Sequence, residues 1–97
     1  MTEYRAEIIA NQSVMDDITE LLEKEIPDFE YTMITETHGK GLKTKKLGDT
    51  VWPEMNFILF AYVSLETAKK IKEVIAQLCA RFPKEGISLF FTKGEDL

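Results

Sequence analysis

The spacing of hydrophobic and polar residues changes several times along the chain, and each change marks a new element. Residues 4–10 alternate loosely, with Ile9 on the face opposite Ile8, which indicates a first strand. A four-residue repeat follows and predicts an amphipathic helix that begins with Ser13 as its N-cap and ends at Pro27. The repeating apolar positions of this helix are Val14, Ile18, Leu21, Leu22 and Ile26.

The rest of the chain gives three more strands and a second helix. Residues 28–38 have a period of two, which predicts a second strand, and residues 57–63 are apolar throughout, which is typical of a strand covered on both faces. Ser64 is a suitable N-cap for a helix that Pro83 closes, and a last strand covers residues 87–92. The stripe of this second helix contains Ala68, Ile71, Val74, Ile75, Leu78 and Phe82.

The order of elements is therefore β-α-β-β-α-β, within one domain that takes up residues 1–97. Two right-handed β-α-β units fold most simply into a four-stranded antiparallel sheet with both helices on one face. This is the ferredoxin-like arrangement of the α+β class. Because the fold hosts many unrelated functions, it decides little about activity.

The strand at residues 57–63 carries apolar side chains on both of its faces, whereas two helices cover only one face of such a sheet. Phe57, Leu59, Ala61 and Val63 point one way, and Ile58, Phe60 and Tyr62 point the other way. Exposure of either set would forfeit roughly 1.5–3 kcal/mol per large side chain. We expect self-association, sheet against sheet. The alternative is that loops or the tail fold back over this face.

The segment 39–55 has no sustained period and contains four lysines within seven residues. A connection of this length between two strands is usually functional or disordered. The spacing Gly39-x-Gly41 allows the backbone to approach an anion closely, and lysines attract phosphate or carboxylate. The pattern predicts an anion site that includes Gly39, Lys40, Gly41 and Lys43. On composition alone, a solvated lysine-rich loop explains the same residues.

Composition narrows the class of protein further. A net charge of −5 argues against nucleic acid as a partner, and the longest apolar run is too short for membrane insertion. The single Cys79 cannot form an intramolecular disulfide, and no metal ligands have zinc-site spacing. No export signal or acid–base pair is visible, so we expect a cytoplasmic protein that is not an enzyme and has no covalent cofactor.

The order of residues in the first half of the chain resembles the P-II nitrogen-regulatory signalling family. The similarity lies in the strand at residues 4–10, the apolar-Asp-Asp-apolar helix start at residues 15–18, and the Thr-Glu-x-x-Gly-x-Gly run at residues 35–41. After residue 41 only the element order matches. The resemblance implies a homotrimer that binds adenine nucleotides, often with another small metabolite, in clefts between subunits. It also implies that residues 39–55 form a T-loop that contacts a regulated transporter or enzyme.

The resemblance also assigns roles to individual residues. Gly39 and Gly41 would lie at the base of the loop, and Ile9 would line the ligand cleft. Lys84 and Gly86 would be remnants of the family's phosphate loop, although a plain helix-to-strand turn explains them equally well. In the loop, we expect the partner contacts to be made by Lys45, Lys46 and Trp52. This chain departs from the family in Leu42 and Lys43, which replace an arginine and a glutamine, and in its shorter loop.

Two other functions compete with this interpretation. A ferredoxin-like trimer that binds a metal ion for a transport system would use Glu36 and His38, two residues apart on one strand, with Asp49 or Glu54. An RNA-recognition module would use the aromatic residues of the strand 57–63 to stack on bases. The expected Lys/Arg-Gly before that strand is absent and the net charge is unfavourable, so we rank the RNA module third.

Overall fold

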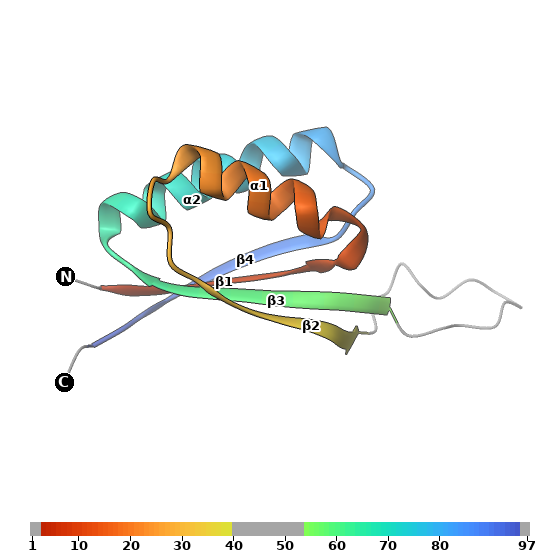
Figure 1. The fold of residues 1–97 in the computed structure, drawn as a ribbon, viewed down its shortest axis with the longest axis horizontal. Coiled ribbons are helices and arrows are strands. Elements are labelled where there is room, and N and C mark those ends of the chain that lie inside the picture. The colour runs from red at the N-terminus through yellow and green to blue at the C-terminus, as the bar shows by residue number, and fades with distance from the viewer. Residues whose placement is uncertain (1–2, 40–53, 96–97) are drawn as a thin grey trace, which may run out of the picture.

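The computed structural model describes residues 3–39 and 54–95, which form one antiparallel sheet with two helices on one of its faces (Figure 1). The strands are β1 (Tyr4–Asn11), β2 (Thr32–Gly39), β3 (Glu54–Val63) and β4 (Ile87–Lys93), and the helices are α1 (Met15–Glu25) and α2 (Leu65–Arg81). The strand order is β2-β3-β1-β4. The ferredoxin-like βαββαβ fold predicted from the sequence is confirmed.

The start of α1 differs from the prediction that Ser13 caps it. A short 3-10 turn, Gln12–Val14, precedes the helix, and the side chain of Asn11 caps this turn by accepting a hydrogen bond from the backbone nitrogen of Ser13 at 2.9 Å. Val14 stands at the N-cap of α1 and makes no side-chain capping bond. The prediction was wrong because Asn11 is also a favourable cap and lies two residues earlier in the chain.

The start of α2 agrees with the prediction that Ser64 is its N-cap. Ser64 has an extended backbone, and its hydroxyl oxygen accepts a hydrogen bond from the backbone nitrogen of Thr67 at 3.2 Å. This bond satisfies one of the free N–H groups of the first turn. The helix ends at Arg81, before Pro83, and the positive charge of Arg81 is favourable at a helix C-terminus.

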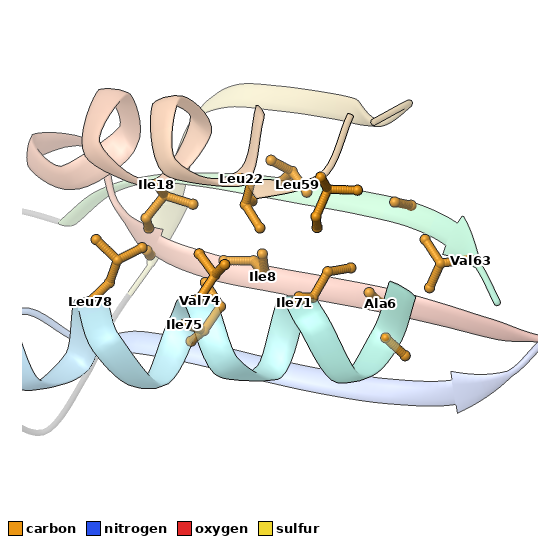
Figure 2. Close-up of a cluster of buried hydrophobic side chains, with 14 of the residues drawn as sticks. Ala6, Ile8, Ile18, Leu22, Leu59, Val63, Ile71, Val74, Ile75 and Leu78 are labelled. Carbon is orange, nitrogen blue, oxygen red and sulfur yellow. The ribbon is translucent and has the colours of Figure 1, made fainter. Parts of the chain in front are cut away.

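The hydrophobic core lies between the helices and the sheet. Figure 2 shows side chains of α1 and α2 pointing toward those of β1 and β3, among them Ile18, Ile71 and Leu59. The core-facing side of β3 carries Phe57, Leu59, Ala61 and Val63, which are all buried, a choice between the two sides that the sequence left open. Each large side chain removed from water in this way stabilises the fold by roughly 1.5–3 kcal/mol.

The opposite face of the sheet, which we call the open face, carries no helix in Figure 1 and remains largely apolar. Tyr62 is 55% exposed, Phe90 is 58% exposed and Ile34 is 47% exposed. The register places Ile58 between Ile34 on β2 and Ile9 on β1, so apolar side chains continue across three strands. The sequence prediction that β3 is apolar on both faces is confirmed.

The strand β2 is irregular where the sequence predicted uniform alternation. Its pairing with β3 shifts between Ile34 and Thr37, and Glu36 has a positive φ of 57°. The shift leaves one extra residue on β2, which is a β-bulge. As a result, Thr37 takes the place on the open face that alternation would give to Glu36. The regular spacing that would place Glu36 and His38 on one face is therefore interrupted.

The β2–β3 ladder is also longer than the sequence predicted. Gly39 pairs with Glu54, and His38 pairs with Met55, so both ends of the expected loop 39–55 belong to strands. Backbone hydrogen bonds continue past the apolar run because the ladder does not require apolar side chains. The segment 40–53 lies outside the described residues.

Candidate ligand site at one end of the sheet

All four strands have an end at one side of the sheet, and several of the predicted site residues gather there. Asn11, the last residue of β1, pairs with Asn56 of β3, which also pairs with Thr37 of β2. On the other side of β1, Ala10 pairs with Ile87, the residue after Gly86. We call this region the loop end; it contains Asn11, Gln12, Thr37, Gly39, Asn56 and Gly86.

The closest packing at the loop end is between Gly39 and Asn56. A β-carbon built on Gly39 would overlap the side-chain amide of Asn56. The hydroxyl of Thr37 donates a hydrogen bond to the backbone oxygen of Asn56 at 2.9 Å, which ties the end of β2 to β3. A larger residue at position 39 would therefore have to displace the Asn56 amide. Asn56 is a site residue that the sequence analysis missed, because only the strand register reveals its contact with Gly39.

One buried polar group at the loop end has no hydrogen-bond partner among the described residues. The side-chain oxygen Oε1 of Gln12 is buried and has no hydrogen-bond donor within residues 3–39 and 54–95. An unpaired buried acceptor of this kind costs about 1–3 kcal/mol. Gln12 directly follows Asn11, so the loop end carries three amide side chains, on Asn11, Gln12 and Asn56.

The predicted residues Ile9, Lys84 and Gly86 also lie toward this end. Ile9 is half-buried on the open face, two residues before the end of β1. Lys84 is exposed in the turn between α2 and β4. A β-carbon on Gly86 would meet nothing within 4 Å, so the space around this turn does not demand glycine.

The loop end is too wide for one small anion to reach all of the predicted residues of a single chain. Gly39 on β2 and Gly86 before β4 are separated by β3 and β1, which is three strand spacings or about 14 Å. A phosphate or bicarbonate ion contacts one side only. An elongated ligand, or a second copy of the chain, is needed to join the two sides.

The remaining predicted site residues lie outside the described residues. These are the ligand-binding candidates Lys40, Gly41 and Lys43 and the partner-binding candidates Lys45, Lys46 and Trp52. Their roles stay predictions.

Charged groups occur in the middle of the open face and are paired with one another. The guanidinium of Arg5 lies 4.4 Å from the ring centroid of Phe60, donates a hydrogen bond to the Tyr62 hydroxyl at 2.9 Å, and forms an ion pair with Glu7 at 3.3 Å. The hydrogen bond to Tyr62 raises the pKa of Arg5 above its usual value. Sequence reasoning missed this cluster because it joins residues 57 positions apart, and only the register of β1 with β3 brings them together.

The structure gives no further support to a metal site. Within the described ranges, no group of three or more His, Cys, Asp or Glu side chains is placed to hold a metal ion. His38 is exposed and pairs with Met55, and Asp49 lies outside these ranges. Likewise, neither helix of the described part is long and apolar enough to cross a membrane.

Comparison with known proteins gives matches among solved structures only. No protein-family model and no curated protein matches the chain. CPII from Thiomonas intermedia, a nitrogen regulatory PII-like protein solved with ADP, AMP and bicarbonate, is 18% identical with a TM-score of 0.70, over 100% of this chain and 98% of that one. A candidate PII-like signalling protein from Thermus thermophilus is 18% identical with a TM-score of 0.67, over 97% of this chain and 88% of that one.

A designed protein shares the same architecture. The de novo protein Foldit4 is 12% identical with a TM-score of 0.57, over 96% of this chain and 99% of its own. At such identities the likeness establishes a shared fold. The resemblance to P-II-like proteins predicted from the first half of the sequence is thus confirmed at the level of the fold, and along nearly the whole chain.

Proposed function

We propose that the chain is a divergent P-II-like regulatory protein. It forms a homotrimer, binds a small anionic ligand, an adenine nucleotide, in the clefts between its subunits, and regulates a transporter or enzyme through the loop of residues 39–55. The observation that carries this proposal is the apolar open face, which reaches the loop end through Ile9 and Ile58.

The open face supports self-association. Its large apolar side chains lie on all four strands, and the most exposed of them are Tyr62 and Phe90. A face that exposes several large apolar side chains around one internal ion pair is uncommon on a monomer and marks an interaction site. Copies that pack these faces together around a symmetry axis remove the same side chains from water in every subunit.

The loop end supports a ligand site next to that contact. Gly39 and Asn56 lie on β2 and β3, the two strands that also carry Ile34 and Ile58 on the open face. Because one chain separates its Gly39 from its Gly86 by about 14 Å, an elongated nucleotide is better suited to bridge the site than a single small ion. The ADP and AMP bound to CPII, which has the same fold, favour this ligand class.

An RNA-binding role has one observation in its favour, the exposed aromatic side chains of the open face. Two features oppose it. Arg5 already covers the ring of Phe60, and Glu7 pairs in register with both Phe60 and Phe90, so a carboxylate lies in the centre of the surface that RNA would use. With a net charge of −5, we prefer contact between copies of the chain.

Calorimetry with ATP, ADP, AMP, cyclic nucleotides and bicarbonate tests the ligand, and sedimentation tests the assembly. We expect a mass of three copies of the 11.2-kDa chain and binding of at least one adenine nucleotide. Gly39→Ala should weaken that binding about tenfold or more, since the new β-carbon displaces the Asn56 amide. Gly94→Ala is the matched control, because its β-carbon meets neighbours only at ordinary contact distances of 3.7 Å and beyond.

The two parts of the proposal fail separately. If the protein is a trimer that binds none of the nucleotides, the proposed nucleotide binding is refuted, whereas the proposed assembly stands. A monomer at micromolar concentration refutes the clefts between subunits, and with them the proposed mode of nucleotide binding. Equal weakening by Gly39→Ala and Gly94→Ala removes the loop end as the binding site.

A further inference from the structure

A groove separate from the loop end lies between the first turns of α2 and the strand β4. Its volume is 270 Å³, and it is lined by Tyr4, Leu65, Ala68, Lys69, Lys72 and Phe91. Tyr4 begins β1 whereas Asn11 ends it, so the groove and the loop end are seven residue steps apart, about 23 Å. A ligand at the loop end therefore does not fill this groove.

The floor of the groove is apolar and incompletely covered. Leu65, the first residue of α2, is 43% exposed, and Phe91 is only partly buried although it packs against the core. The sheet order places β4 at an edge, where β1 is its one neighbour among the described strands. The helix α2 thus leaves part of the helix-facing side of β4 open to contact.

The rim of the groove is positively charged. Lys69 and Lys72 are three residues apart on α2, so they lie on the same side of the helix, and both are exposed. Neither lysine forms an ion pair within the part of the chain that the structure describes. Glu66 and Glu73 are exposed on the same helix, but the residues that line the groove include two lysines and no acidic residue.

The size of the groove favours a single inserted side chain. Pockets for small molecules typically enclose about 300–1,000 Å³, and this groove is smaller. Apolar anchors that enter small pockets carry much of the affinity of protein–protein contacts, while charges at the rim select and orient the partner. The two lysines at the rim attract an acidic segment to this groove.

We propose that the groove docks an acidic segment of a partner protein. One apolar side chain of that segment inserts between Leu65 and Phe91, and the carboxylates beside it face Lys69 and Lys72. This docking surface is independent of the nucleotide site, because none of its residues belongs to the loop end.

The test uses the full chain and a short fluorescein-labelled peptide with one phenylalanine between aspartates. A matched peptide carries lysines in place of the aspartates. We expect fluorescence anisotropy to show binding of the acidic peptide only, with backbone amide shifts in nuclear magnetic resonance concentrated at Leu65, Lys69, Lys72 and Phe91. The double variant Lys69→Glu/Lys72→Glu should weaken binding about tenfold, since each reversal replaces an attraction by a repulsion.

Lys70→Glu is the control, because Lys70 is exposed on the same helix but does not line the groove. It should change the affinity less than about twofold. Leu65→Gln, which keeps the charge, should weaken binding without changing its salt dependence. The proposal is overturned if Lys70→Glu weakens the affinity as much as the double variant does. It is also overturned if the two peptides bind equally well, or if the acidic peptide does not bind at millimolar concentration. A change of oligomeric mass in the double variant assigns the groove to a contact between copies and also overturns it.

Discussion

Replacement of Phe90 by serine separates the stability of one chain from the stability of its assembly. Because 58% of Phe90 is exposed in the single chain, its loss removes little burial within the fold, and we expect the fold to be retained. In an assembly that covers the open face, the exposed part of the ring is buried as well. That part is worth a little over half of the roughly 1.5–3 kcal/mol for full burial, or about 1–2 kcal/mol per copy.

In the proposed trimer, three copies together lose about 3–5 kcal/mol of association free energy, which corresponds to a weakening of about a hundredfold to several thousandfold. Sedimentation velocity over a range of protein concentrations measures this change. Leu65→Ser is the control, since Leu65 is a similarly exposed apolar residue in the helix layer, away from the open face. The reasoning is refuted if both variants dissociate at the same concentration as the unmodified protein, or if the unmodified protein is already monomeric.

Two further predictions concern the fold. Ser64→Ala should lower the free energy of unfolding in urea by about 1 kcal/mol, since the first turn of α2 loses its cap, whereas Ser13→Ala should change it by less than about 0.5 kcal/mol because Asn11 provides the cap there. Burial, and to a smaller extent the charge of Glu23, raises the pKa of Tyr31 above 10.0. The folded state therefore favours the neutral phenol, and the stability that this group contributes is present below about pH 10 and is lost as the pH rises through the raised pKa. Urea unfolding at about pH 8 and about pH 11 should show that loss, and Tyr31→Phe should reduce it; an unchanged pH dependence in the variant contradicts this assignment.

The fold was predictable because both helices and the strand at residues 57–63 have clear hydrophobic patterns. The apolar stripes of both helices and the uniformly apolar strand 57–63 are long enough to fix the element order, and the two-sided character of that strand identified the open face. The local features that were not predicted depend on competition between neighbouring residues. Asn11 provides a cap before Ser13 does, and the bulge at Glu36 breaks an alternation that the side chains alone suggest.

The candidate site was predictable only in part. Glycine at position 39 drew attention to the loop, but its contact with the amide of Asn56 was not foreseen, because Asn56 is 17 residues away and becomes a neighbour only through the strand register. Lys84 and Gly86 lie toward the loop end, and no packing contact requires glycine at position 86. The contact between Arg5 and Phe60 was missed for the same reason as Asn56, because it joins two strands distant in sequence.

The pairing of Arg5 with Glu7 has a consequence for any assembly that closes over the open face. A guanidinium without a counter-ion, enclosed among aromatic side chains, would be repelled by the same group of every other subunit. The repulsion would grow with each subunit added. Here every copy brings its own carboxylate within 3.3 Å of the cation, and the hydroxyl of Tyr62 accepts a further N–H. This pair would therefore add no net charge to the interior of a closed ring, whatever the number of subunits.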